Sequence, residues 1–277
     1  MADISPSPYF IVDAFTSRPF SGNPAAVVPL EQWKDDQWLQ NVAMEMNLSE
    51  TAFFVRDGDG FHLRWFTPNV EVDLCGHATL ATAKIISHQG MVEEGREVNF
   101  ASRSGKLVAR VGAEMIELDF PVKPEEPAEA PAGVIESLGV SPRYVGRNSF
   151  DYLVEVDSER TVRGMSPDFK RLAAVSCRGI IVTARSDDPS FDFVSRFFAP
   201  AAGIDEDPVT GSAHCCLADF WRRRLGKSKM ICYQASSRGG VVHVEVHGDR
   251  AILGGQAVIV AAGELVFESS IVSTCVK

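Results

Sequence analysis

The chain has 277 residues, of which 45% are hydrophobic and 23% are charged, a composition in the ordinary globular range that excludes a disordered chain. Its formal net charge of −10 argues against electrostatic capture of nucleic acid or of an anionic membrane surface. No apolar stretch is long enough to cross a membrane, and residues 1–8 have neither the basic nor the apolar segment of a signal peptide. We therefore expect a cytoplasmic protein without a nucleic-acid or membrane partner.

The first half of the chain has two helical patterns and two strand patterns. Polar and apolar residues at helical spacing predict a surface helix over residues 30–46. Residues 61–68 alternate in character, are rich in aromatic residues and end in a proline, which predicts a strand. Residues 106–111 also alternate and predict another strand. Between these strands, residues 78–89 are rich in alanine and leucine and end near Gly90, which predicts a buried helix.

The second half follows a segment rich in proline and glutamate, residues 121–131, which predicts a linker. Residues 193–200 and 241–246 have strand patterns similar to those of the first half. Between them, residues 213–225 are apolar on most sides and predict a second buried helix, which Gly226 ends.

An internal repeat is the most informative feature of the chain. Three landmarks recur in the same order, at separations of 132, 135 and 135 residues: Arg64 and Arg196, Gly76 and Gly211, Arg103 and Arg238. A period near half the chain length is too long for a solenoid. We therefore predict two similar halves, residues 1–123 and 124–277, related by a pseudo-twofold axis. Each half has several strands and one buried helix, so the fold class is α+β, with a barrel-like sheet around a central α-helix in each half.

Each predicted buried helix follows a glycine turn, at Gly76 and at Gly211. A helix N-terminus presents unpaired N–H groups and partial positive charge, and a glycine there lets an anion approach the backbone. If a twofold axis relates the halves, the two helix starts face one cleft, which would suit a small carboxylate substrate. In the alternative, Thr210 and Ser212 are ordinary helix caps and the glycines only turn the chain.

Three titratable side chains are candidates for the chemistry. Glu50 stands between a helix end and an apolar strand, where burial would raise its pKa toward neutrality, as general acid–base catalysis needs. The same pattern also allows an exposed glutamate in a loop. His77 follows the first glycine, and Asp207 precedes a proline, and both arrangements are often purely structural. Residues 22–24, which include Asn23, predict a turn.

The six cysteines form no C-x-x-C pair, and the His and Cys spacings match no usual zinc pattern, so we predict no metal site. The chain also lacks the glycine-rich phosphate and dinucleotide loops and the G-x-S-x-G nucleophile motif. These absences favour proton chemistry without a cofactor. Cys75 lies at the first helix start, where a thiol pKa can fall, but the matching residue is Thr210, which excludes a symmetric pair of thiol bases.

Five segments, taken together and in this order, resemble the phenazine biosynthesis-like (PhzF-like) isomerase family: residues 10–15, 22–27, 47–53, 74–79 and 206–213. The resemblance extends from about residue 9 to about residue 263. It implies a diaminopimelate epimerase-like fold, a homodimer, and an active site between the two halves that needs no cofactor.

The resemblance also implies roles for individual residues. Glu50 would move the proton, and His77 and Asp207 would be the other catalytic residues. The substrate-binding residues would be Asn23, Gly76, Gly211 and Ser212. Epimerases and racemases of similar fold use a cysteine in each half, and Thr210 in the second position disfavours that two-base reaction.

We therefore predict a cofactor-independent isomerase that moves a proton on a small carboxylate by Glu general acid–base catalysis. Two alternatives stay open at this point. One is a non-catalytic small-molecule-binding or adaptor protein that keeps the site without turnover. The other is an epimerase or racemase on the same fold, with Cys75 as one base and a group other than a thiol as its partner.

Overall fold

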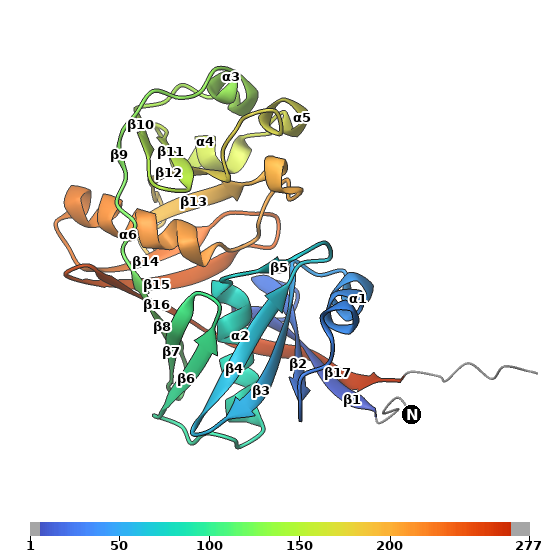
Figure 1. Cartoon of the computed structure of the whole chain (residues 1–277). Helices are drawn as coiled ribbons and strands as arrows, with labels where there is room; N and C mark the ends of the chain where they lie inside the picture. Colours follow the sequence, from blue (N-terminus) through green and yellow to red (C-terminus); the bar gives the residue numbers. More distant parts are fainter. Residues whose placement is uncertain (1–5, 267–277) are drawn as a thin grey trace, which may run out of the picture.

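The computed structural model describes residues 6–266, which form two groups of strands, each with a long helix packed against it (Figure 1). Residues 1–5, the first part of the N-terminal segment considered above, and Cys275 lie outside this range. Within residues 6–266, no helix combines the length and the apolar character that a membrane span requires.

The helices and strands alternate irregularly along the chain. The first group contains β1 (Ser7–Ala14), β2 (Asn23–Leu30), α1 (Asp36–Met46), β3 (Glu50–Asp57), β4 (Gly60–Phe66), β5 (Glu71–Val72), α2 (Gly76–His88), β6 (Glu97–Ser102), β7 (Gly105–Val111) and β8 (Ile116–Pro121). Then follow β9 (Glu126–Pro127), α3 (Val134–Leu138), β10 (Tyr144–Arg147), β11 (Asp151–Glu155), α4 (Glu159–Gly164), α5 (Phe169–Leu172), β12 (Gly179–Arg185), β13 (Phe193–Phe198), a 3₁₀ turn (Pro200–Ala202), α6 (Gly211–Leu225), β14 (Lys229–Gln234), β15 (Gly240–His247), β16 (Arg250–Gly255) and β17 (Ala257–Leu265).

The strands of the two groups pair in the same succession of directions. The pairs β1–β2, β2–β3, β3–β4, β4–β6, β6–β7 and β7–β8 are antiparallel, parallel, antiparallel, parallel, antiparallel and antiparallel. The pairs β10–β11, β11–β12, β12–β13, β13–β14, β14–β15 and β15–β16 repeat these directions in order. The internal repeat predicted from the sequence is therefore present in the sheet topology.

Two strand pairings join the groups. Strand β8 is antiparallel to β16, with Leu118 opposite Leu253. The last strand, β17, returns to the first group and runs antiparallel to β1, with Tyr9 opposite Gly263 (Figure 1). Residues 121–131 contain the short strand β9, which pairs with β10. The division of the chain at residue 123 stays a prediction, and β17 adds a strand from beyond that point to the sheet of the first group.

The two long helices confirm the predicted buried helices, although each begins two residues earlier than expected. Helix α2 starts at Gly76 after the extended N-cap residue Cys75, and α6 starts at Gly211 after the extended N-cap residue Thr210. Most residues of both helices are buried, as their apolar circumference requires. Gly226 ends α6 in the left-handed conformation, with a φ of 68°.

Helix α1 and the segment before it correct two sequence predictions. The expected helix over residues 30–46 covers only Asp36–Met46, because Leu30 is the last residue of β2, which pairs along its length with β3. Asp35 caps the helix by accepting a hydrogen bond from Trp38 N at 2.8 Å. The expected turn over residues 22–24 ends at Gly22, whose φ is +66°, and Asn23 already belongs to β2.

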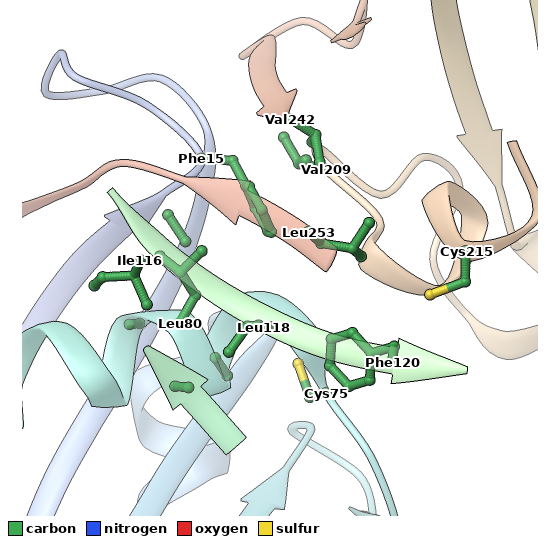
Figure 2. Packing of buried hydrophobic residues seen from close by; sticks show 14 of the residues in the cluster. Phe15, Cys75, Leu80, Ile116, Leu118, Phe120, Val209, Cys215, Val242 and Leu253 are labelled. Atoms are coloured by element: carbon green, nitrogen blue, oxygen red, sulfur yellow. The ribbon is translucent and has the colours of Figure 1, made fainter. Parts of the chain in front are cut away.

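One hydrophobic core extends through both groups. Figure 2 shows part of it, where β8 carries Leu118 and Phe120 past the start of α2 and Leu253 of β16 lies on the other side. Cys75, the N-cap residue of α2, and Cys215, in the second turn of α6, belong to the same buried cluster. The two helix starts are therefore held in place by shared packing, and burial of this apolar surface is the main force that fixes their relative position.

Candidate functional site

The starts of α2 and α6 approach each other closely. A Cβ atom built on Gly76 would lie 3.6 Å from the Cα atom of Gly211, and a Cβ atom built on Gly211 would lie 3.6 Å from the Cα atom of Gly76. Neither N-cap side chain makes a capping hydrogen bond. Because the first N–H groups of a helix have no intrahelical acceptor, two positively polarised helix ends meet at this point.

Glu50 lies beside the start of α2. It is the first residue of β3, and its side chain is only 14% exposed. Its Oε2 atom lies 3.3 Å from Nε2 of His77, the second residue of α2. Burial raises the pKa of Glu50 to about 8, and the negative charge of Asp207 acts in the same direction, whereas a hydrogen bond with the Cys75 thiol lowers it. The carboxyl group is thus mostly protonated at neutral pH and can both donate and accept a proton near it.

His77 is a neutral imidazole in this environment. Burial lowers its pKa to about 3, so the ring does not carry a charge at neutral pH. Its Nδ1 atom lies 3.2 Å from Nδ2 of Asn23 and 3.4 Å from Sγ of Cys75. His77 and Glu50 therefore form a pair of mostly uncharged groups near neutrality.

Asn23 connects the two halves of the molecule. It is fully buried at the first position of β2, and its Nδ2 donates to Oδ1 of Asp207 at 2.7 Å and to the Val209 carbonyl at 2.9 Å. An amide nitrogen has only two hydrogens, so these two short contacts occupy both, and the longer approach to His77 is a polar contact without a donated hydrogen. Asn23 thus fixes the orientation of Asp207 from the opposite half.

Asp207 is the second carboxyl group of the site. It lies in the loop before α6 and accepts a 2.5 Å hydrogen bond from Oγ1 of Thr210 as well as the bond from Asn23. Burial raises its pKa to about 6, and the two hydrogen bonds and the positive charge of Arg178 oppose this rise. Near neutrality the two carboxyl groups therefore favour different states, with Asp207 ionised and Glu50 protonated.

Ser212 and two residues that the sequence analysis did not single out complete the surroundings of α6. Ser212 Oγ accepts a hydrogen bond from Nη2 of Arg178 at 3.0 Å. Gln234, fully buried at the end of β14, accepts from Thr210 N at 2.9 Å and donates to the Asp207 carbonyl at 2.7 Å. A glutamine at the end of a strand is a weak sequence signal for a site residue. No local pattern around Arg178 connects it with Ser212, which lies 34 residues further along the chain.

Cys75 lies beside Glu50 and His77 at the start of α2. Burial, followed by the charge of Glu50, raises the pKa of the Cys75 thiol, so the sulfur is protonated at neutral pH and does not resemble an activated thiolate. Glu50, Cys75 and His77 each offer one ligand atom, and these atoms lie within 4.8 Å of one another. Their types are compatible with zinc, although their sequence spacing follows no usual zinc pattern. The predicted absence of a metal stays a prediction.

Four of the predicted site residues form one chain of contacts through their polar side chains: Glu50, His77, Asn23 and Asp207. The two glycines of the helix starts form a second contact. Glu50 and His77 contact each other, and Asn23 contacts Asp207 while lying beside His77. Gly76 and Gly211 form the contact between the helix starts, and the side chain of Ser212 faces Arg178. The residues come together in space as expected, and their individual roles stay predictions.

Comparison with known proteins gives a consistent result over nearly the whole chain. Residues 12–263 match the family model of the phenazine biosynthesis-like protein, PhzC-PhzF. A protein of Halalkalibacterium halodurans named as an uncharacterized isomerase is 51% identical over 260 residues, which cover 94% of this chain and 98% of that protein.

Solved structures agree with the sequence comparison. A crystal structure of a PhzF family protein from Enterococcus faecalis, 44% identical, superimposes with a TM-score of 0.91 and covers 95% of this chain and all of that chain. A probable proline racemase from Agrobacterium radiobacter has a TM-score of 0.61 at 11% identity, over 95% of this chain and 93% of that chain, a likeness of fold alone. These likenesses confirm the predicted epimerase-like fold class, and the chain belongs to the phenazine biosynthesis-like (PhzC-PhzF) family.

Proposed function

We propose that the protein is a cofactor-independent isomerase that moves a proton between two positions of a small carboxylate substrate. The observation that carries this proposal is the buried carboxyl group of Glu50, beside neutral His77 at the start of α2 and with its pKa raised to about 8. A general acid–base group works best when its pKa lies near the working pH, because it then both accepts and releases a proton readily. The naming of a close relative as an isomerase supports the same reaction class.

In the proposed reaction, Glu50 in its ionised form removes a proton from a carbon atom that a neighbouring carboxyl group or π-system acidifies. The electron pair left by the broken C–H bond moves into that π-system. The carboxyl proton of Glu50 exchanges with solvent, and Glu50 then delivers a proton to a second carbon atom, so the net change is an isomerisation with no oxidant and no second substrate. His77 and Asp207 orient the substrate and influence the proton affinity of Glu50.

The substrate carboxylate binds, in this proposal, at the contact of the two helix starts. The N–H groups next to Gly76 and Gly211 and the hydroxyl group of Ser212 hold the carboxylate and the negative charge that develops during proton removal. Asn23 is placed to maintain the position of Asp207 across the two halves. A homodimer in the cytoplasm also stays a prediction, and sedimentation analysis of the purified protein tests the dimer.

The direct experiment is carbon-bound hydrogen exchange in D₂O. The protein is incubated with a panel of amino acids and unsaturated cyclic carboxylates, and incorporation of deuterium at carbon is followed by NMR and mass spectrometry. We expect exchange in at least one compound with an acidified C–H bond. Ligands that bind but never exchange would instead support the non-catalytic alternative, and inversion of a stereocentre without migration of a double bond would support the epimerase alternative.

A further inference from the structure

We propose that the substrate is a small dicarboxylate, whose second carboxylate is bound by Arg178 and Lys123 beside Ser212. This inference rests on the proposed function, which places the first carboxylate at the contact of the two helix starts. Three features support the second binding position: the orientation of Arg178, the charge of Lys123, and the exposed Phe150 ring that both cations approach.

Arg178 is held so that its charge points outward. Its guanidinium forms an ion pair with both carboxylate oxygens of Asp151, with an Nε–Oδ1 distance of 2.8 Å. The Asp151 carboxylate is completely buried, whereas the Arg178 side chain is 41% exposed. The positive end of this pair is therefore its accessible end. Nη2 reaches Ser212, and among residues 6–266 no hydrogen bond is made by Nη1, which leaves donors for an acidic ligand.

Lys123 supplies a second positive charge near the ring of Phe150, which Arg178 also approaches. The Phe150 ring, 47% of whose residue surface is exposed, has the Arg178 guanidinium carbon 5.1 Å and the Lys123 Nζ atom 5.5 Å from its centroid. The Lys123 side chain is partly buried, and within the described part of the chain no carboxylate lies within ion-pairing distance of it. An anion bound beside this ring would therefore meet the charge of Lys123 and the free donors of Arg178.

Both cations lie next to the first turns of α6. The backbone N–H of Lys123 donates to the Cys215 carbonyl at 3.1 Å, and the charges of Lys123 and Arg178 both act on the Cys215 thiol. Arg178 also acts on the nearby Asp207 carboxylate. The proposed second position is thus adjacent to the helix start that would hold the first carboxylate. A second acidic group on the substrate would give Lys123 an anionic partner and would meet the exposed side of the Arg178–Asp151 pair.

The test measures binding of matched acids by titration calorimetry. Propionate carries one carboxylate, and succinate and glutarate carry two at different separations. We expect one of the dicarboxylates to bind the wild-type protein about tenfold more tightly than propionate, since a charge-assisted contact contributes about that much. In Lys123→Gln this advantage should disappear while propionate binding is unchanged. Lys106→Gln, an exposed lysine on β7, is the matched control and should keep the advantage.

Arg178→Gln should weaken the binding of the dicarboxylates, but it leaves the buried Asp151 unpaired and can destabilise the fold. The double variant Arg178→Gln with Asp151→Asn removes both charges and keeps the test valid. Equal binding of propionate and the dicarboxylates by the wild-type protein, or an advantage that survives in Lys123→Gln, would overturn this inference alone. If none of the acids bound at millimolar concentration, the carboxylate-binding part of the proposed function would fail with it.

Discussion

Helices α2 and α6 start alike, each with an extended N-cap residue followed by a glycine, but the side chains around the two starts differ in kind. Around α2 lie Glu50, Cys75 and His77, which all favour an uncharged state at neutral pH. Around α6 lie an ionised Asp207, fixed by hydrogen bonds, and Ser212, which is bonded to a cation. The repeated fold thus supplies equivalent positions, and the proposed division of work is that the first half moves protons while the second holds charge.

The largest expected effect follows from replacing Glu50. In Glu50→Gln the basic oxygen is lost while size and polarity are kept, so deuterium exchange should fall roughly 10²–10⁴-fold. Ligand binding should remain, because the proposed carboxylate position lies on the helix starts. Glu45→Gln, an exposed change on α1, serves as the control and should exchange normally. Unchanged exchange in Glu50→Gln would remove Glu50 from the mechanism and transfer attention to Asp207.

The pH dependence of stability gives the next largest effect. Because the pKa of Glu50 is raised from 4.5 to about 8, the folded protein binds this proton more tightly than the unfolded chain does. Its stabilising contribution is complete below pH 4.5 and is lost as the pH rises through about 8. Glu50→Gln lacks this dependence, so its free energy of unfolding relative to wild type should rise by up to about 5 kcal/mol over that range.

Denaturant unfolding at a series of pH values measures this difference. His77 is present in both proteins, so its own titration cancels from the comparison. A difference between Glu50→Gln and wild type that stays constant across the range would contradict the buried, proton-binding state of Glu50.

Replacing Gly211, at the start of α6, should have two smaller effects in opposite directions: thermal stability stays equal or increases, and anion affinity falls. In Gly211→Ala the new methyl group would lie at ordinary contact distance, 3.6 Å, from the Cα atom of Gly76, so the chain should still fold. Alanine is favoured over glycine within a helix by roughly 0.5–1 kcal/mol, so thermal stability should stay equal or increase. The methyl group would add bulk beside the N–H groups proposed to hold the anion, and propionate affinity should fall about tenfold. Calorimetry and thermal unfolding of one sample measure both effects, and unaltered affinity would place the carboxylate elsewhere.

The smallest effect is expected at Cys75. Its protonated thiol touches His77 and interacts with Glu50 but is not predicted to move the proton. Cys75→Ser should therefore keep exchange to within about tenfold of wild type, below the usual contribution of a general base. A loss as large as that in Glu50→Gln would instead make Cys75 a base and restore the epimerase alternative.

The repeat explains why much of the fold could be predicted from the sequence. Apolar helices that end at glycine and strands that alternate are local patterns, so α2, α6, β7 and β15 were found close to their observed limits. The start of α1 was wrong because residues 30–35 satisfy a helical pattern only approximately, while pairing of β2 with β3 keeps Leu30 in the sheet. Tertiary pairing overrode the local preference there, as it did at Asn23.

The site was harder to predict because its contacts span long separations in the chain. Asn23 reaches Asp207 and Val209, and Arg178 reaches Ser212. No local pattern encodes such pairs. The sequence also left the environment of Glu50 open between burial and exposure, and only the packing of β3 beside α2 resolves it, with 14% of the side chain exposed. Family motifs therefore indicate which residues are candidates for the site, whereas their protonation states depend on packing that only the three-dimensional structure shows.

The pairing of β17 with β1 has a consequence for synthesis of the chain on the ribosome. One side of β1 is covered by β2, but the other is covered by residues 257–265, which are translated more than 240 residues after β1. Until then, the nascent N-terminal sheet exposes an unpaired strand edge, a feature that promotes association with other chains. We therefore expect that release of a chain shortened before residue 257 yields aggregates, and that folding of the first half is completed only after residues 257–265 have left the ribosome.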